Sequence, residues 1–254
     1  MTLSVVLITQ NEEDNLPGTL ASVMPLVGDG RGEIIVVDSG STDRTLEIAR
    51  SYRAKVFVEP WKGFAAQKNS AIDKASCDWL LQLDADEALE PELTNEIESA
   101  LKNSSKLDGF WIPRKNFFLG RWIRHGGFYP DPKLRLIRRG AGRFQEYGAH
   151  PTIQVSGPTG RLKHALIHNA YPTLRDYIDH MNSYSSMGAQ VAAEKGHRSF
   201  SLLNIVVRPL LTFKYNYFIR LGFLDGREGL LLHLYHAVYV SWKYAKAWEA
   251  ARKA

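Results

Sequence analysis

The segment Trp79-Leu-Leu-Gln-Leu-Asp-Ala-Asp86 joins an apolar run to two carboxylates that are separated by one residue. A short apolar run of this kind predicts a buried strand, so the two acids stand at its carboxyl end. Carboxylates placed in this way can approach a divalent cation and the ribose of a nucleotide, and oxygen ligands suit Mg²⁺ or Mn²⁺. The same pattern is also typical of an acidic turn that caps the next segment.

Three earlier segments are also short apolar runs. They predict buried strands over residues 4–8, 33–38 and 55–58, and helical spacing of apolar residues follows in 16–27, 46–49, 63–75 and from Pro91. Alternating strands and helices favour an α/β fold with a parallel sheet that helices cover on both faces. Such sheets bind ligands at the carboxyl ends of their strands.

Polar clusters stand at three of those strand ends, in Thr9 to Glu12, Asp38 to Asp43 and Asp84 to Glu87. Their convergence on one edge is the main indication of function. Asp38 can accept hydrogen bonds from a nucleobase or from ribose hydroxyls, or the turn after it can cap a helix. Glu12 can face the same nucleotide, or it can offset the dipole of the helix that follows.

Two more residues on this edge carry alternative interpretations. The side chain of Asn11 is typical of a helix cap. Lys68, in Gly63 to Asn69, is a cation that would meet a diphosphate, although a solvated surface lysine has the same appearance.

Composition and length limit the class of protein. The 254 residues are 44% hydrophobic and 23% charged, which excludes a disordered chain, a collagen-like repeat and a coiled coil. The single cysteine, Cys77, excludes a disulfide framework and indicates a reducing, cytoplasmic compartment. We expect neither a signal peptide nor a membrane-spanning helix.

The chain changes character twice along its length. Shorter strands with Gly and Pro between them follow residue 108, and helical patterns begin at Leu174 with a break near Gly196. We therefore expect a nucleotide-sugar-binding α/β part in 1–110, an acceptor-side part of the same catalytic domain in 111–172 and a basic, aromatic helical extension in 173–254.

The C-terminal extension carries the positive charge of the chain. Residues 195–254 hold ten Lys/Arg against three Asp/Glu, a balance of +7, which leaves −2 of the net +5 for residues 1–194. Basic residues interleaved with aromatics suit an anionic membrane surface, and nucleic acid would also attract such charge, although no nucleic acid is expected as a partner. A packed helical cap with its charges outside is the alternative.

The ordered motifs resemble the family 2 inverting glycosyltransferases of GT-A fold. The resemblance rests on Thr9, Asn11 and Glu12, on the V-V-D-x-x-S-x-D turn at Asp38 to Asp43, on Gly63 to Asn69 and on the D-x-D at Asp84 to Asp86. It covers about the first 110 residues. It implies a GT-A type nucleotide-binding sheet flanked by helices, with a donor site formed by Thr9, Asn11, Glu12, Asp38, Lys68, Asn69 and Asp84.

The second half resembles a subgroup that builds the lipopolysaccharide core, often as glucosyltransferases. The similar stretches include Trp61-Lys-Gly-Phe64, Gly127-Phe-Tyr-Pro-Asp131, Leu166-Ile-His168 and Gly222-Phe-Leu-Asp-Gly226. The subgroup usually has His-Glu where this chain has His150-Pro151, so a role for that Glu does not carry over.

The resemblance also implies the residues that act on the sugar. The general base of the family lies in an E-D-x-x-L-type motif, which Pro130-Asp-Pro-Lys-Leu134 matches with Pro in place of Glu, so Asp131 is the expected base and Glu146 the second candidate. Either acid can instead pair with Arg135, Arg138 or Arg143. Asp86 and Asp84 are the expected metal ligands, and His168 can join them.

These observations together predict a metal-dependent hexosyltransferase. It would transfer a sugar from a nucleoside-diphosphate donor, with UDP-glucose the best guess, to a hydroxyl of a lipopolysaccharide core or related glycolipid. Two other classes stay open. A nucleotidyltransferase would need a basic glycine-rich loop where this chain has Gln-Asn-Glu-Glu-Asp14, and a nucleotide-binding scaffold on the membrane would not need Asp84, Asp86 and Asp131.

Overall fold

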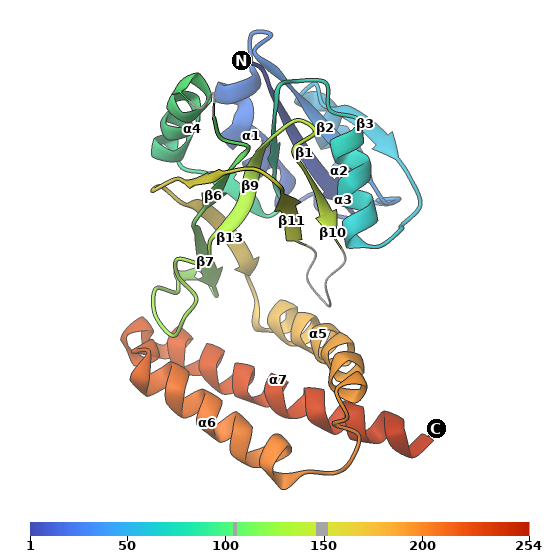
Figure 1. Ribbon diagram of the computed structural model, residues 1–254, viewed down its shortest axis with the longest axis vertical. Helices are drawn as coiled ribbons and strands as arrows, with labels where there is room; N and C mark the ends of the chain where they lie inside the picture. Colours follow the sequence, from blue (N-terminus) through green and yellow to red (C-terminus); the bar gives the residue numbers. More distant parts are fainter. Residues whose placement is uncertain (104–105, 146–151, 254) are drawn as a thin grey trace. The chain divides into compact units, whose positions relative to one another are not determined.

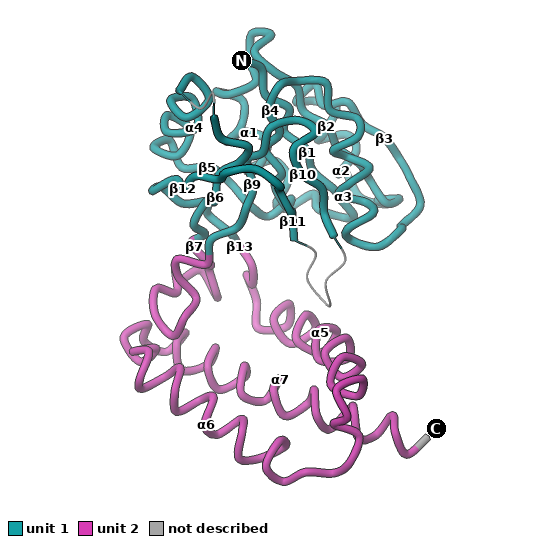
Figure 2. Tube along the Cα trace, viewed as in Figure 1, with its two compact units in different colours: residues 1–114, 132–147, 151–168 teal, residues 115–131, 148–150, 169–254 magenta. Residues whose placement is uncertain are grey.

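The protein divides into two compact units (Figure 2). The computed structural model describes residues 1–103, 106–145 and 152–253. Of these, the first unit takes residues 1–114, 132–145 and 152–168, and the second takes 115–131 and 169–253. Each unit is described by itself below.

The first unit is built on a mixed sheet of seven strands in the order β12-β6-β9-β4-β1-β2-β3 (Figure 1). Their bounds are Leu3–Thr9 (β1), Gly32–Asp38 (β2), Lys55–Val58 (β3), Trp79–Gln82 (β4), Gly109–Ile112 (β6), Lys133–Arg138 (β9) and Thr159–Arg161 (β12). Strands β1 to β4 are parallel, as the alternation of strand and helix signals predicts. Strand β9 then lies antiparallel between β4 and β6, which the sequence did not indicate.

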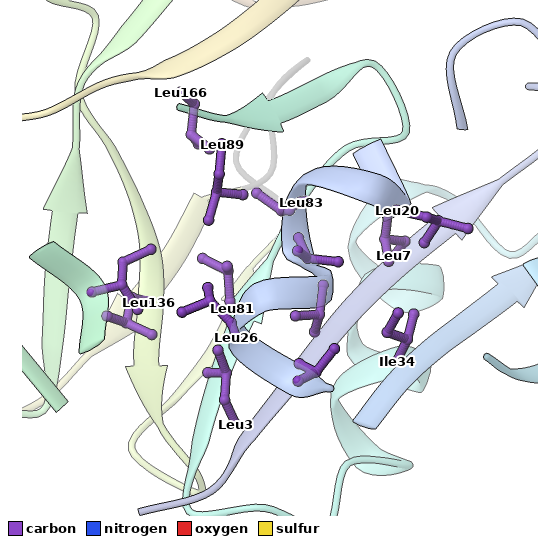
Figure 3. Close-up of a cluster of buried hydrophobic side chains, with 14 of the residues drawn as sticks. Leu3, Leu7, Leu20, Leu26, Ile34, Leu81, Leu83, Leu89, Leu136 and Leu166 are labelled. Carbon is purple, nitrogen blue, oxygen red and sulfur yellow. The ribbon is translucent and has the colours of Figure 1, made fainter. Parts of the chain in front are cut away.

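Alternate residues of the central strands pack on opposite faces of this sheet. Leu3, Val5 and Leu7 face one buried cluster, whereas Val6 faces the other. The first face is covered by α1 (Leu16–Val27), α2 (Thr45–Ser51) and α4 (Pro91–Asn103), as the side chains of Figure 3 illustrate for Leu7, Leu20 and Leu81. The second face is covered by α3 (Phe64–Asp73) together with the hairpin of β10 (Gly142–Gln145) and β11 (Thr152–Val155).

A smaller sheet has the strand order β5-β13-β7-β8. Its strands are Glu87–Leu89 (β5), Leu166–Tyr171 (β13), Arg114–Phe118 (β7) and Arg121–Trp122 (β8). Within the first unit, β13 pairs with β5 so that His168 lies opposite Glu87. This register brings the late histidine beside the turn that follows β4.

The second unit is mainly helical. Its elements are α5 (Leu174–Glu194), the π-helical turn η1 (Leu203–Val207), α6 (Arg208–Lys214), the π-helical turn η2 (Tyr215–Ile219), the short 3₁₀ helix η3 (Gly222–Asp225) and α7 (Gly226–Lys253). Thr173 and Asp176 form a capping box that begins α5, and Gly196, with φ 87°, follows its end, where a break was expected.

Helices α5 and α7 pack along each other through small and aromatic residues (Figure 1). Ala189 and Ala192 of α5 meet Val240, Tyr244 and Ala247 of α7. No helix in the part of the chain that the structure describes has an apolar stretch long enough to cross a membrane.

Candidate active site

The D-x-D turn leaves strand β4 at the edge of the sheet where the polar clusters were expected to meet. The hydroxyl of Thr19 donates to the carbonyl oxygen of Ala85 at 2.6 Å, and the backbone N–H of Asp84 donates to Oε2 of Glu87 at 3.0 Å. The middle of the turn is therefore fixed by α1, and its beginning is fixed by the acid that opens β5.

A buried arginine, Arg135 of β9, lies directly behind this turn and is 5% exposed. Its guanidinium donates to Oδ2 of Asp84 and to Oε1 of Glu87, each at 2.6 Å, and also to the amide oxygen of Gln82. Arg114 donates to the same oxygen of Glu87 at 2.9 Å. Glu87 is completely buried, and these two guanidinium groups supply the positive charge that a buried carboxylate needs as a partner.

Lys68 of α3 is the second cation on Asp84. Its ammonium lies 2.5 Å from Oδ1 of Asp84, and the residue is 8% exposed. Burial alone would raise the pKa of Asp84, but Arg135 and Lys68 hold that pKa well below its ordinary value. Lys68 is therefore not the solvated surface lysine of the alternative interpretation, and both oxygens of Asp84 are engaged by cations.

Asp86 has a different partner. Its Oδ2 lies 3.3 Å from Nε2 of His168, which β13 brings into place. Burial alone would raise the pKa of Asp86, but the imidazole of His168 lowers that pKa below its ordinary value, so this carboxylate is ionised. An ionised carboxylate and an imidazole nitrogen thus lie next to each other at the edge of the sheet.

This pair fits a divalent cation only as part of its coordination. Among the described residues, no group of three or more His, Cys, Asp or Glu side chains gathers as a metal site. However, Mg²⁺ at nucleotide sites commonly has one or two protein ligands and completes its coordination with phosphate oxygens and water. Asp86 and His168 are suited to serve as those protein ligands. Asp84 is suited to this role only if Lys68 or Arg135 moves away from one of its carboxylate oxygens.

Asp38 is buried inside the turn that follows β2. Its two oxygens accept four hydrogen bonds, from the hydroxyl of Thr9 (2.8 Å), the N–H of Gly40 (2.9 Å) and both the N–H (2.7 Å) and the hydroxyl of Ser41 (2.5 Å). With 0% of its surface exposed, Asp38 ties the ends of β1 and β2 together. Contact of Asp38 with a nucleotide stays a prediction.

The interpretation of Asn11 as a helix cap is wrong. Helix α1 begins at Leu16, and its N-cap position is Asn15. Asn11 instead has a left-handed backbone, with φ 54°, and its Oδ1 accepts from the N–H of Thr42 at 2.8 Å. Its amide side chain therefore joins the first turn of the site to the second.

The contacts that the structure describes for Glu12 include no cation. Asn15 donates to its carboxylate at 3.0 Å. Burial raises the pKa of Glu12, and the nearby carboxylates of Asp86, Asp43 and Asp84 raise it further. The structure thus brings Glu12 within electrostatic reach of the D-x-D turn, as the strand-end argument predicts.

The remaining candidates fall elsewhere. Asn69 exchanges two hydrogen bonds of 2.9 Å with the backbone of Phe144, so it holds strand β10 against α3. Asp131 belongs to the second unit, where the amide of Asn116 donates to its Oδ2 at 3.2 Å. Glu146 and His150 lie outside the described residues.

The sequence did not indicate the ion pairs behind the turn. Arg135, Arg138 and Arg143 were considered as partners of Asp131 or Glu146, but they pair with Asp84 and Glu87, with Asp108 and with Asp73 respectively. One residue in the sequence points to such a contact. Gln82 is a polar residue inside an otherwise apolar strand, and a buried polar side chain requires a hydrogen-bond partner.

We predict that Arg135 is essential for stability, because its loss leaves Asp84 and Glu87 buried with less compensating charge. Arg135→Met is expected to lower the free energy of unfolding by about 3 to 5 kcal/mol, measured by urea denaturation. Arg135→Lys keeps the charge but cannot reach three acceptors with one ammonium, so it should recover only part of that loss.

The matched control is Arg143→Met, which removes a well-formed but exposed ion pair with Asp73, whose N–O distance is 2.8 Å. Its cost should stay within about 1 kcal/mol. Equal, small losses for the Arg135 and Arg143 variants would contradict the structural role given to Arg135.

We also predict that Glu12 destabilises the fold at neutral pH. Its pKa is raised in the folded state, so the folded protein binds a proton more readily than the unfolded chain does. Below the unfolded value of 4.5, Glu12→Gln and the wild type should have the same melting temperature. As pH rises past the raised pKa, the variant should become the more stable of the two. A variant that is less stable than the wild type at pH 7 would disprove this.

Comparison with known proteins shows the family of the chain. A family model described as glycosyl transferase family 2 matches residues 4–166. The lipopolysaccharide core biosynthesis glycosyltransferase LpsC of Rhizobium meliloti is 30% identical over 97% of this chain and 92% of its own length.

Solved structures of glycosyltransferases share the fold. The mannosyltransferase PcManGT of Pyrobaculum calidifontis, in complex with GDP-Man and Mn²⁺, has a TM-score of 0.57 at 15% identity and covers 96% of this chain and 86% of its own. Residues 1–349 of S. aureus TarS, in complex with UDP-GlcNAc, give 0.51 at 20% identity and cover 100% of this chain and 92% of that one. These comparisons confirm the predicted α/β architecture and favour a glycosyltransferase over the other two classes. The chain belongs to glycosyltransferase family 2 and has the GT-A fold.

Proposed function

We propose that this glycosyltransferase moves a hexose, with inversion, from a nucleoside-diphosphate sugar to a hydroxyl of a lipopolysaccharide core or related glycolipid. UDP-glucose is the donor that we propose, on the resemblance of the second half of the chain to glucosyltransferases. The observation that supports the proposal is that the two acids of the D-x-D turn have different partners. Asp84 is neutralised by Lys68 and Arg135, whereas Asp86 pairs with the imidazole of His168.

The donor site follows from this asymmetry. We assign Asp86 and His168 to a divalent cation, Mg²⁺ or Mn²⁺, which supplies positive charge against the negative charge of the departing diphosphate when it is bound. The mannosyltransferase of Pyrobaculum calidifontis was solved with both Mn²⁺ and a nucleoside-diphosphate sugar, which supports the assignment. Lys68 adds positive charge at the same edge, and it also holds Asp84 in position for the donor.

The nucleoside end of the donor is assigned to the turns that follow β1 and β2. Thr9 and Asp38 bind each other, and Asn11 binds the backbone of Thr42, so these side chains fix the shape of the two turns. Glu12 lies within electrostatic reach of the D-x-D turn and carries a carboxylate that can accept hydrogen bonds from ribose hydroxyls.

Asp131 is the proposed general base. As the acceptor oxygen attacks the anomeric carbon, the carboxylate of Asp131 takes the proton of that hydroxyl. Two observations support the choice: the match of Pro130 to Leu134 to the family motif, and the hydrogen bond from Asn116, which orients the carboxylate. Glu146 stays the second candidate.

The acceptor and the compartment are proposed on separate grounds. The name of LpsC supports a lipopolysaccharide core acceptor. A single free cysteine, Cys77, is compatible with a reducing compartment, so we propose that the enzyme works in the cytoplasm, on the inner face of the membrane that holds such an acceptor.

The metal assignment predicts the behaviour of Asp86→Asn. Release of UDP from UDP-glucose in the presence of a glycolipid acceptor should fall by at least ~10²-fold, the scale of losing a group that stabilises charge in the transition state. The rise in melting temperature that UDP with Mn²⁺ causes in the wild type should also disappear. Asp73→Asn, which changes an exposed carboxylate of α3, is the control and should keep both properties. Full turnover of the wild type in excess EDTA would rule out the metal.

The base assignment predicts a separation of binding from chemistry. Asp131→Asn keeps the shape of the side chain but removes the proton acceptor, so kcat should fall by about 10² to 10⁴ while the Kd for UDP stays within a factor of about two. Glu146→Gln is measured beside it. If the Asp131 variant stays active and the Glu146 variant does not, Glu146 is the base.

A further inference from the structure

The second unit exposes a continuous apolar face along η1, α6 and η2. Two rows of residues run every fourth position, one from Leu202 to Phe218 and the other from Leu203 to Ile219. All ten positions are exposed, nine of them are apolar or aromatic, and Lys214 is the exception. Leu202, Leu210 and Ile219 are 65%, 62% and 71% exposed. Large contiguous apolar surfaces of this kind mark interaction sites.

The helical geometry keeps this face on one side. In an α-helix, every fourth residue moves around the axis by about 40°, so a four-residue repeat drifts off one face. The wider i→i+5 turns of η1 and η2 rotate the repeat back, and they stand before and after α6. The pattern of π-helical and α-helical turns therefore matches the spacing of the apolar residues.

The opposite side of the same segment is already used for packing. Asn204 and Pro209 are buried, and Ile205 packs against the core between α5 and α7. The hydroxyl of Ser241 donates to the carbonyl of Ile205 at 2.7 Å, and Arg208 donates to the hydroxyl of Tyr244. The segment is thus fixed on α7 with its more apolar side outward.

The charges around the face indicate its partner. Residues 195–224 contain five Lys/Arg and no Asp or Glu. Lys195, Arg198, Lys214 and Arg220 are exposed and flank or interrupt the apolar rows, whereas Arg208 is bonded to Tyr244 on the packed side. A second copy of the chain would bring the same positive charge to the same surface, so self-association is disfavoured. An apolar face with basic and aromatic residues around it fits a bilayer with anionic headgroups.

We infer that residues 202–224 form a docking surface for an anionic lipid bilayer. The segment lies in the plane of the headgroups, with Leu210, Leu211 and Ile219 inserted among the acyl chains and the cations at the phosphates. The aromatic residues of the C-terminal quarter accordingly divide in two. Tyr215 and Phe218 of η2 and Phe223 of η3 are exposed at this surface. Tyr239 and Tyr244 of α7 pack inside the unit.

The docking surface is joined to the loop that carries Asp131. The N–H of Gly126 donates to the carbonyl of Arg220 at 2.9 Å. Asp225, which is 1% exposed, accepts from the N–H groups of Arg124 (3.1 Å) and His125 (2.8 Å), and its other oxygen lies 2.9 Å from Nδ1 of His125. All these residues belong to the second unit. That this connection serves a lipid-linked acceptor rests on the proposed function, whereas the docking surface does not.

Vesicle flotation at low salt tests the surface, with no donor or acceptor present. The wild type should float with vesicles that contain phosphatidylglycerol, should not float with pure phosphatidylcholine, and should detach as salt is raised. The double variant Leu211→Gln/Ile219→Gln should bind at least about tenfold more weakly, because two large apolar side chains no longer enter the bilayer. Val58→Gln, a change at a residue of β3 that is 58% exposed, is the matched control and should bind as the wild type does.

The charge contribution is tested in the same assay. Lys214→Glu should weaken binding to anionic vesicles by about tenfold or more, whereas Lys102→Glu on α4, with the same change in net charge, should not. All substituted side chains are exposed, so the melting temperatures should match the wild type and a folding defect would be recognised.

Three results would overturn the inference. The first is that the wild type does not bind anionic vesicles, and the second is that the Val58 variant loses as much vesicle binding as the double variant. The third is that light scattering shows a dimer that the double variant no longer forms, while no vesicle binds. The last result would assign the face to a second copy of the chain. Because sugar transfer is not measured here, a failure of docking and a failure of the proposed function remain separate results.

Discussion

The contact between Arg135 and the two acids Asp84 and Glu87 is the constraint on which the site depends. Asp84 and Glu87 flank the turn that contains Asp86, and both are held from behind by one guanidinium. A buried carboxylate without such a partner would lose its proton only at a high free-energy cost. The pairing therefore fixes the path of the turn, in which Asp86 lies beside His168.

The topology of the sheet explains why Arg135 can do this. Strand β9 enters antiparallel beside β4, and the register pairs Leu81 with Leu136, so the next residues, Gln82 and Arg135, lie opposite each other at the end of β4. Four residues before Arg135 in the chain stands Asp131, at the end of the loop that belongs to the second unit. One short stretch thus supplies the anchor of the D-x-D turn and the proposed base.

The first hundred residues were largely predictable because their signals are local. Apolar runs gave β1 to β4, helical spacing gave α1 to α4, and strand ends gave the polar edge that holds Glu12, Lys68, Asp84 and Asp86. The failures involve contacts between distant segments. Asn11 looks like a helix cap, but a partner 31 residues away, Thr42, binds its side chain. Arg135 pairs with acids 51 and 48 residues away, because β9 lies antiparallel beside β4, a pairing that no local pattern predicts. The C-terminal aromatics were ambiguous for the same reason, since only the packing on α7 decides which of them are left exposed.

The central claim is that Asp86 and His168 hold the cation while Asp84 stays with Lys68 and Arg135. The measurement that addresses it most directly is the anomalous scattering of Mn²⁺ in crystals grown with UDP. We predict a manganese peak within bonding distance of Asp86 and His168, with the contacts of Asp84 to Lys68 and Arg135 unbroken. A peak bound to Asp84 with Lys68 displaced, or UDP bound without any manganese at this turn, would contradict the claim.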